Sequence, residues 1–252
     1  MIPLHKKLFL IILLLAGTIL AEMQVDEEYH YVVNYLMLPS LDMKMTLSYN
    51  YDFDGGKTGK IYVTTKTKRF FNTIFEIDNH YSTVFQLADK CCLFHQKNIH
   101  QPNVTQNLQV EYNDQKALYS NGESRTFKAA RIYDFFSMLV YLRKTDHREL
   151  EKQTIIVDME GEFFQVNFLI GGTELLSIGK EKIETRKIRL VYQKVHRDQQ
   201  SVLEYTDIFF WKMAEETGEK YIWLETDKNK RIIKARFSDG RGALEAKLVD
   251  PR

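Results

Sequence analysis

The sequence predicts a mainly β protein, built as a large curled antiparallel sheet or partly closed β-barrel with one central buried helix at about 132–145. Three observations predict this fold class. Apolar and polar residues alternate with period 2 through most of the chain, tight-turn residues separate the alternating runs, and a single short segment is apolar at nearly every position. Because a sheet of so many strands cannot stay flat, it is expected to twist and curl.

The first 21 residues are expected to lie outside this fold. Lys6 and Lys7 precede an apolar run at 8–17, and small residues lead up to Ala21, which is the layout of a secretory signal peptide. The run is shorter than the roughly 20 residues of a membrane-spanning helix, and no later run is long and apolar enough to cross a bilayer. Residues 22–252 are therefore expected to form a single exported β-rich domain. The alternative is that residues 1–21 stay attached as an N-terminal anchor.

The charges of the chain are balanced. It carries 35 Lys and Arg against 34 Asp and Glu, mixed along the sequence. A nucleic-acid-binding protein usually carries a basic patch or stripe, so nucleic acid is not an expected partner.

The two cysteines, Cys91 and Cys92, are adjacent. Neighbouring side chains of a strand point to opposite faces, so the pair cannot easily close a disulfide on itself. We expect one buried thiol and one more exposed thiol; a strained vicinal disulfide and an intermolecular disulfide are the alternatives. The sequence does not determine their redox state.

The first half of the domain predicts a run of antiparallel strands. At 43–51, Met, Leu and Tyr side chains alternate with Lys, Thr, Ser and Asn, which is typical of a half-buried strand. Residues 54–56 supply a turn that tolerates positive φ. A second hairpin is predicted at 69–89, with its turn at Asp78 and Asn79. The other predicted strands are 59–68, 92–98, 107–113 and 116–120.

The predicted helix follows these strands. Asp134 is its expected N-cap, and Ser137 lies three residues later. Almost every position at 135–142 is apolar, so the helix should be covered on more than one side, and the concave face of the curled sheet is expected to enclose it. Arg143 in the last turn should meet the negative helix end or a nearby carboxylate. The alternative is that Asp134, Ser137 or Arg143 contacts a ligand.

The second half predicts strands again. A hairpin is predicted at 153–170 with its turn at Glu160 and Gly161, and a turn at Gly171 and Gly172 leads into a strand at 173–179. The other predicted strands are 182–195, 206–213, 220–227, 231–238 and 243–249.

Aromatic residues concentrate near the C-terminal end. Trp211 lies on the predicted 206–213 strand, and Tyr221 and Trp223, two residues apart on the next strand, are expected to share one face. Most such side chains are core residues. The sharper interpretation is that they line a concave apolar pocket, so Tyr221, Trp223 and Trp211 are the candidate ligand-binding residues.

The spacing of Asp134, Ser137, Leu142 and Arg143 resembles the central signature of the domain-of-unknown-function 3108 family of exported bacterial envelope proteins. The stretches "FFNTIFEIDNHYSTVFQ", "YIWLETDKNKRIIKARF" and "GRGALEAKL" are similar to that family's early hairpin, late Trp strand with its return strand, and closing strand. The resemblance implies export to the bacterial periplasm or cell envelope, a β-rich domain and no established reaction. It assigns structural roles to the four signature residues. The implied architecture is similar to that of periplasmic lipoprotein carriers, whose cavity holds acyl chains, but an analogy of fold does not establish function.

The chemical motifs of common enzymes do not occur in the sequence. It contains no HExxH zinc motif, no G-x-S-x-G nucleophile elbow and no phosphate-binding G-x-x-x-x-G-K. We therefore predict no catalytic residue, no metal and no cofactor. The expected function is non-catalytic binding of an apolar or amphiphilic ligand, or of a partner protein, in the concavity of the sheet. The alternatives are a structural or assembly protein with no small ligand and an envelope hydrolase built on convergent acids or a Cys–His pair.

Overall fold

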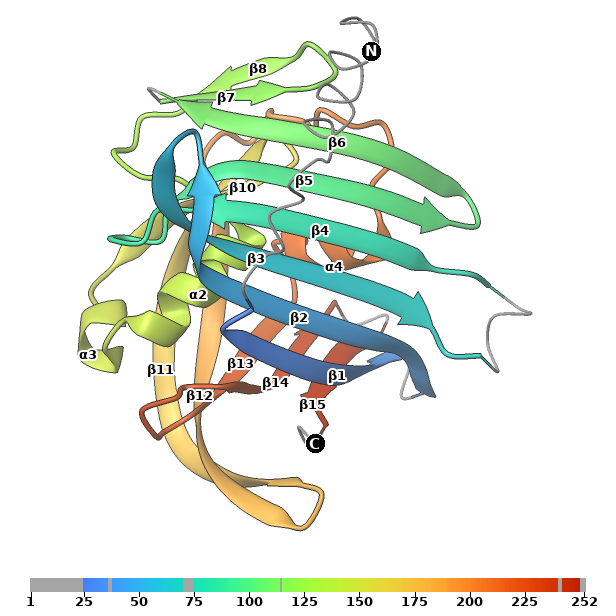
Figure 1. The fold of residues 1–252 in the computed structure, drawn as a ribbon, viewed down its shortest axis with the longest axis vertical. Helices are drawn as coiled ribbons and strands as arrows, with labels where there is room; N and C mark the ends of the chain where they lie inside the picture. The colour runs from blue at the N-terminus through green and yellow to red at the C-terminus, as the bar shows by residue number, and fades with distance from the viewer. Residues whose placement is uncertain (1–24, 36–37, 70–74, 114, 240–241, 250–252) are drawn as a thin grey trace, which may run out of the picture.

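The computed structural model describes residues 25–35, 38–69, 75–113, 115–239 and 242–249. The predicted signal segment, 1–21, lies outside these residues. In the described part of the chain, one sheet of 15 strands runs in the order β8-β7-β6-β5-β4-β3-β2-β1-β15-β14-β13-β12-β11-β10-β9 (Figure 1). The first half comprises β1 (Glu27–Tyr35), β2 (Leu38–Phe53), β3 (Gly56–Thr67), β4 (Asp78–Phe85), β5 (Cys92–Gln101), β6 (Val104–Asn113), β7 (Lys116–Tyr119) and β8 (Ser124–Thr126). The second half comprises β9 (Tyr133–Asp134), β10 (Thr154–Met159), β11 (Glu162–Ile178), β12 (Glu181–Lys194), β13 (Glu219–Glu225), β14 (Ile232–Ser238) and β15 (Ala243–Leu248).

Most neighbouring strands of the sheet are antiparallel and consecutive in sequence, and the first and last strands of the chain pair in the middle of the strand order. β1 pairs antiparallel with β15, so the first and last strands of the domain join the two halves. The short β9 pairs in parallel with β10 and forms one edge of the sheet, while β8 forms the other. The sheet therefore curls without closing, which confirms the predicted fold class.

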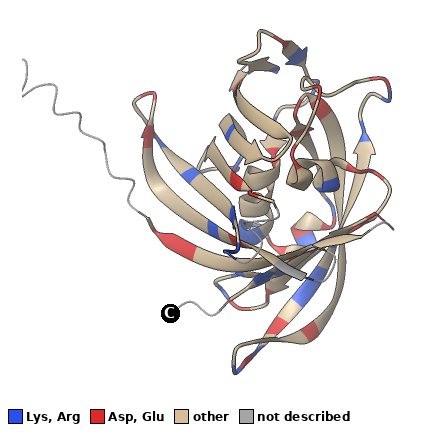
Figure 2. Cartoon of the chain, turned by 90° about the vertical axis from the view of Figure 1, so that its right-hand side faces the viewer, with Lys and Arg blue, Asp and Glu red and all other residues tan. Residues whose placement is uncertain are grey.

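Three helices accompany the sheet in the described residues: α2 (Phe135–Lys144), α3 (His147–Leu150) and α4 (Ile208–Ala214). Figure 1 shows β2 to β6 on the near side, β11 to β13 behind them, and α2 and α4 between the two halves. In the perpendicular view, Lys and Arg are interspersed with Asp and Glu over the strands (Figure 2). None of the helices in the described ranges has the length and apolarity needed to cross a membrane.

The central helix is confirmed. α2 buries seven of its ten residues, including Met138 and Leu142. Phe136 packs against Tyr81 of β4 with ring centroids 5.1 Å apart, and Phe135 packs against Phe237 of β14 at 5.8 Å. The helix therefore contacts both halves of the curled sheet, as expected of an apolar segment that cannot remain in water.

A second, smaller core spans the gap between the two sheet edges. Side chains of β6 and β7, among them Leu108, Val110 and Tyr119, pack with Phe163 of β11. Close to this gap the backbone amide of Cys92 donates to the carbonyl of Ile132 at 2.9 Å. Side-chain packing thus connects strands that the hydrogen-bonded ladder does not join.

Two predicted turns are wrong. Asp78 and Asn79 begin β4, opposite Lys66 and Thr65 of β3, and 75–77 is not a strand; residues 70–74 lie outside the described part. Because Asp78 and Asn79 pair with β3, their backbone is part of the strand and forms no hairpin turn.

Gly171 and Gly172 lie inside β11, which continues to Ile178. Here the register with β12 shifts between Ile170 and Thr173, because the glycines form a bulge. A Cβ on Gly171 would lie only 3.0 Å from the carbonyl oxygen of Lys187, so the close approach of the two backbones favours glycine at this position.

The predicted strand at 206–213 is also wrong, because most of it forms α4. The carboxylate of Asp207 accepts hydrogen bonds from the amides of Phe209 at 2.9 Å and Phe210 at 3.1 Å, which caps the helix. Phe209, Phe210 and Met213 are buried, and Trp211 points outward. A short apolar run has no periodicity that separates strand from helix, and the N-cap decides between them.

Candidate functional site: an apolar cavity beside buried polar contacts

An apolar cavity of about 70 Å³ lies between the helices and the concave face of the sheet. Its helix side consists of Phe135, Phe136 and Leu139 of α2 with Phe209 and Met213 of α4, and its sheet side consists of inward-facing residues of β1 to β4, β14 and β15. A buried water needs about 10–15 Å³ and several polar partners. The cavity therefore has room for roughly five water-sized groups, and its walls suit a short apolar segment.

The walls can change shape. Met43, Met45 and Met213 line the cavity, and methionine is unbranched and adapts to irregular space. Opposite the helices, Ala235 of β14 and Ala246 of β15 are register partners whose small side chains both line the cavity. The space therefore depends on this pair of alanines remaining small.

The signature residues Asp134, Ser137 and Leu142 occupy the ends and core of α2. The carboxylate of Asp134 accepts from the amide of Ser137 at 2.8 Å, and the Ser137 hydroxyl accepts from the amide of Asp134 at 3.0 Å. The two residues form a capping box. Leu142 is fully buried among the core side chains.

Asp134 also holds two side chains of the first half. Thr83 of β4 donates to its Oδ2 at 2.6 Å, and Nδ1 of His95 of β5 lies 2.9 Å from the same oxygen. Burial by itself would raise the pKa of Asp134, but the hydrogen bond and charge of His95, with the bonds from Ser137 and Thr83, hold that pKa below its ordinary value. The carboxylate therefore connects α2 to β4 and β5.

This trio differs from a catalytic Ser-His-Asp arrangement. In that arrangement the nucleophile and the carboxylate contact opposite ring nitrogens. Here the Thr83 hydroxyl lies 3.0 Å from Nδ1 of His95, the same nitrogen that faces Asp134. All three side chains are buried, so the contacts hold elements together and expose no nucleophile to a substrate.

Arg143 lies at the C-terminal end of α2 and meets a carboxylate, one of the two predicted outcomes. Its guanidinium donates to Oε2 of Glu27 at 2.6 Å and to the Tyr29 hydroxyl at 2.9 Å. Its Nε donates to the carbonyl of Lys230 at 3.0 Å. One side chain thus connects the helix with β1 and with the turn before β14.

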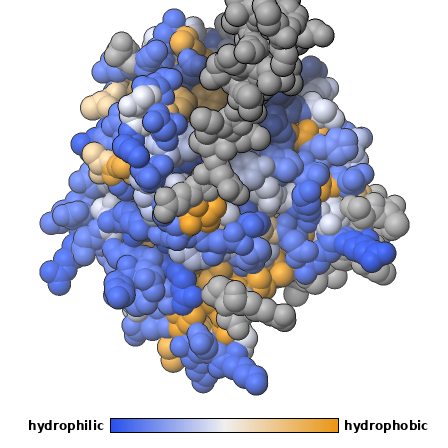
Figure 3. Space-filling view, viewed as in Figure 1, coloured by the Kyte–Doolittle hydropathy of each residue, from blue (hydrophilic) through white to orange (hydrophobic). Residues whose placement is uncertain are grey.

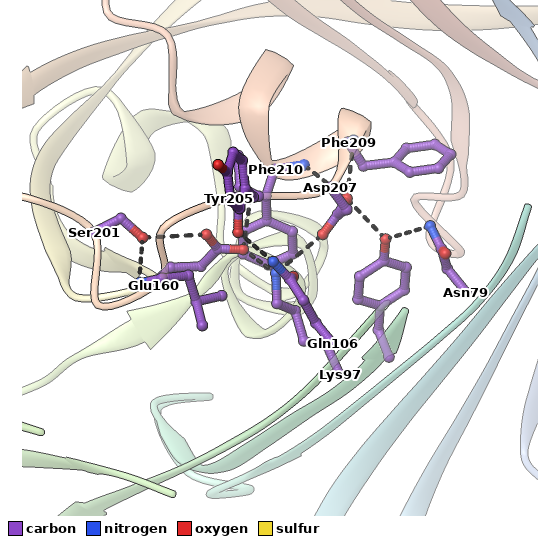
Figure 4. Close-up of polar contacts among 12 residues, drawn as sticks. Asn79, Lys97, Gln106, Glu160, Ser201, Tyr205, Asp207, Phe209 and Phe210 are labelled. Atoms are coloured by element: carbon purple, nitrogen blue, oxygen red, sulfur yellow. Dashed lines mark hydrogen bonds and ion pairs between the residues drawn. The ribbon is translucent and has the colours of Figure 1, made fainter. Parts of the chain in front are cut away.

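A second buried polar group surrounds Lys97, whose side chain is fully buried on the inward face of β5 (Figure 4). Its Nζ contacts the carboxylate of Glu160, in the β10–β11 turn, and lies 3.2 Å from Oδ2 of Asp207. Tyr81 of β4 donates to Oδ1 of Asp207 at 3.0 Å, and Thr206 donates to Glu160 at 2.8 Å. This Lys97 cluster fastens α4 to both halves of the sheet.

The sequence interpretation missed this cluster, although one signal was present. Lys97 stands in period-2 register with His95 and Ile99, and a lysine on a buried face requires a charged partner. The partners, Glu160 and Asp207, are 63 and 110 residues away along the chain. Burial raises the pKa of Glu160, and the charge of Lys97 opposes that rise.

Asp158 of β10 forms a third buried polar contact. It accepts from the hydroxyls of Tyr112 at 2.9 Å and Tyr119 at 2.6 Å, and from the amide of Gly161 at 2.7 Å. Burial raises the pKa of Asp158 above its ordinary value, although these bonds partly counteract the rise. The contact lies where β6 and β7 pack on the second half of the sheet.

The raised pKa of Asp158 predicts how Asp158→Asn changes the pH dependence of stability. The folded protein holds the Asp158 proton more tightly than the unfolded chain, so this group's stabilising contribution is present at low pH and is lost as pH rises through the raised pKa. The wild type should therefore gain stability relative to Asp158→Asn as pH falls from 7.5 toward about 4.5. Urea denaturation across that range measures the difference in stability. The titration of Glu160 drops out of this difference, because both proteins contain Glu160. A difference that does not change with pH would contradict the raised pKa.

The three candidate ligand-binding aromatic residues lie away from the cavity. The rings of Tyr221 and Trp223 are 5.8 Å apart, so they share a face as predicted. That face is opposite to Ile222 and Leu224, which join the main core. The Trp223 indole donates to Glu174, and Nζ of Lys187 lies 4.0 Å from the centroid of the Tyr221 ring.

Trp211 is in the exposed part of α4 and borders a different, polar hollow that also includes Glu160 and Glu216. Sheet curvature decides which face of β13 is concave, and the helical turn decides where Trp211 points. The residues that do line the cavity come mainly from β1 to β3, α2, α4, β14 and β15.

Both cysteine thiols are free and buried, which corrects the expectation that one would be exposed. β5 begins at Cys92, so Cys91 precedes the strand and strand alternation does not apply to the pair. Burial raises the pKa of the Cys91 thiol to about 12. Among the described residues, no group of three or more His, Cys, Asp and Glu side chains is arranged to hold a metal ion.

Neither a protein-family model nor a curated protein sequence matches this chain. In structure the chain is similar to a β-barrel-like protein of the domain of unknown function DUF1849 from Brucella abortus, with a TM-score of 0.55 and 10% sequence identity. The similarity covers 88% of this chain and 95% of that protein. At this identity the similarity shows the fold alone, a large curled and mostly β structure.

Proposed function

We propose that this protein is a non-catalytic binding protein that holds an apolar or amphiphilic ligand in the cavity between α2, α4 and the concave face of the sheet. The observation that carries the proposal is the cavity itself, an unfilled space of about 70 Å³ with apolar walls in the main hydrophobic core. Small-molecule sites are commonly concave and mainly apolar with a few polar groups. The methionines around it give the walls the adaptability that a longer chain would require.

The surface beside this cavity supports the same proposal. Figure 3 shows hydrophobic surface gathered in the lower centre of the face, where Figure 1 places β1 and β15, while most of the remaining face is hydrophilic. Strands β1 and β15 contribute Tyr31, Leu244 and Ala246 to the cavity wall. An apolar ligand would therefore reach the cavity over a surface that is itself apolar.

Export to the bacterial periplasm or cell envelope is part of the proposal. It is supported by the signal-peptide layout of residues 1–21. Membership of the domain-of-unknown-function 3108 family is likewise proposed, on the spacing of Asp134, Ser137, Leu142 and Arg143. Detection of a mature chain that begins near residue 22 in a periplasmic extract would test the location; a full-length chain in the membrane fraction would contradict cleavage.

Filling the cavity tests the binding proposal. Ala246→Phe places a ring in the space next to Ala235, so it should abolish binding of the fluorescent probe N-phenyl-1-naphthylamine. The free energy of unfolding should change by no more than about 1–3 kcal/mol, because overpacking is partly relieved by the empty volume. Ala214→Phe is the matched control, since Ala214 borders the polar hollow instead. Equal probe binding by Ala246→Phe, Ala214→Phe and the wild type would refute the proposal.

The alternative, an assembly protein with no small ligand, is favoured by one observation. Leu169 and Leu175 are 50% and 64% exposed on the long β11–β12 hairpin, which extends beyond the body of the sheet (Figure 1). Native mass spectrometry of the protein purified from its own envelope separates the two functions. A bound ligand that Ala246→Phe abolishes supports the binding proposal, whereas a stoichiometric protein partner that Leu175→Lys abolishes supports the alternative.

A further inference from the structure

Two residues that line the cavity carry a hydroxyl group with no hydrogen-bond partner among the described residues. They are Tyr31 of β1 and Thr65 of β3, and both side chains are buried. Both hydroxyl oxygens lie behind the apolar surface of the empty cavity, so the two side chains must turn for the hydroxyls to reach a ligand. A buried hydroxyl without a partner loses its bonds to water and gains nothing in return, so such groups are rare and require an explanation.

The two hydroxyl-bearing residues stand in one row of the sheet. Tyr31 pairs with Met43 of β2, and Met43 pairs with Thr65 of β3. All three line the cavity, so their side chains share the concave face. Two strand spacings separate Tyr31 from Thr65, which places their backbones about 9–10 Å apart.

Neighbouring tyrosines show that the fold can satisfy a buried hydroxyl on this face. The Tyr29 hydroxyl bonds to Glu27 at 2.9 Å, and the Tyr81 hydroxyl donates to Asp207 at 3.0 Å. Tyr31 lies two residues from Tyr29 on the same face of β1. Tyr31 therefore differs from these two neighbours in having no partner for its hydroxyl group.

We propose that the cavity takes an apolar chain carrying an uncharged carbonyl-type oxygen, which accepts hydrogen bonds from the hydroxyls of Tyr31 and Thr65. This inference rests on the proposed binding function and names the ligand class. Hydroxyl groups can each donate a proton to such an oxygen. An ester or a protonated acid is favoured over a carboxylate, because a buried anion requires its own counter-charge and none of the described residues that line the cavity is charged.

The test compares methyl octanoate with n-undecane, which has the same number of non-hydrogen atoms but no oxygen, and with octanoate at pH 8. Each is titrated against N-phenyl-1-naphthylamine bound to the full chain. The wild type should bind the ester about tenfold more tightly than the alkane. Tyr31→Phe and Thr65→Val should each weaken ester binding about three- to tenfold and leave alkane binding unchanged.

The melting temperature of the empty variants supplies a second readout. Removing a hydroxyl that has no partner should leave the melting temperature equal or higher, and a clear fall in either variant would overturn the premise. Tyr192→Phe is the matched control. Tyr192 does not line the cavity, and its buried hydroxyl lies 3.9 Å from the sulfur of Met138.

The outcomes separate this inference from the proposed function. Equal affinity for ester and alkane, tightest binding of octanoate, or an ester preference that survives both substitutions would overturn the carbonyl assignment while apolar binding stands. If neither ester nor alkane displaces the probe, the proposed function itself fails.

Discussion

Lys97→Met is expected to lower the free energy of unfolding by about 3–5 kcal/mol. Lys97 is fully buried and its ammonium contacts the carboxylates of Glu160 and Asp207. Methionine keeps the length of the side chain and removes the charge, so it leaves two buried carboxylates without their cation. One removed partner of a buried ion pair is far more destabilising than the pair is stabilising, because the remaining charge has lost both water and counter-charge.

The control for Lys97→Met is Lys66→Met on β3. Nζ of Lys66 lies 3.1 Å from Asp78, and its side chain is 61% exposed. Water screens an exposed pair, so this substitution should change stability by at most about 1 kcal/mol. Urea denaturation at pH 7 measures both variants. Similar losses of stability in the two variants would mean that the charge of Lys97 does not stabilise its contacts with Glu160 and Asp207.

A second variant separates charge from packing at the Lys97 cluster. Replacing Glu160 by Gln together with Lys97 by Met removes one uncompensated carboxylate, so the double variant should recover part of the lost stability. The two side chains touch, and substitutions in contact are not additive. A double variant that is less stable than Lys97→Met alone would show that packing, not the buried charge, determines the loss.

Asp134→Ala is expected to lower the free energy of unfolding by about 2–4 kcal/mol, the combined loss of a helix N-cap and of partners for buried polar groups. The Asp134 carboxylate caps α2 through Ser137 and accepts from Thr83, with His95 beside it. Alanine removes the carboxylate that these buried groups contact, and it leaves the amide of Ser137 without its cap. The control is Asp146→Ala, which removes the exposed N-cap of the short α3 and should lower stability by about 1 kcal/mol or less.

The pH dependence gives an independent test of Asp134. Its folded-state pKa is held below the ordinary value of 3.8, so its stabilising contribution is complete above about pH 4 and is lost as pH falls through the folded-state pKa. This direction is opposite to that of Asp158. Asp134→Asn keeps an oxygen for the cap but does not titrate, so the stability difference between wild type and Asp134→Asn should shrink below about pH 4. A constant difference would contradict the lowered pKa.

The central helix was predictable because its signals are local. Asp134 and Ser137 are three residues apart, and an apolar run of helical length follows them at once. Two other elements depend on similar signals that point both ways. The run Ile208–Ala214 is too short for periodicity to distinguish helix from strand, and Gly171 with Gly172 suits a bulge as well as a turn.

The candidate site was less predictable, because its residues meet through pairings far apart in sequence. Strand periodicity places Tyr221 and Trp223 on one face and His95 and Lys97 on one face, and the structure agrees with both. Periodicity does not say which face is concave. That depends on which strands pair and how the sheet curls around α2. The curl placed Lys97 on the concave side and Trp223 on the opposite face of its strand, where the indole is buried but lies away from the cavity.

By itself, the sequence determined the class of this protein: an alternating pattern long enough for one large antiparallel sheet, a single apolar helix with its own cap, and an N-terminal stretch typical of export. These follow from contacts between residues a few positions apart. Only the tertiary structure decided the pairing of β1 with β15, the Lys97 cluster, and the row of Tyr31, Met43 and Thr65 at the cavity. Each of these depends on which strands become neighbours when the sheet curls around its helices, and local periodicity does not determine that choice.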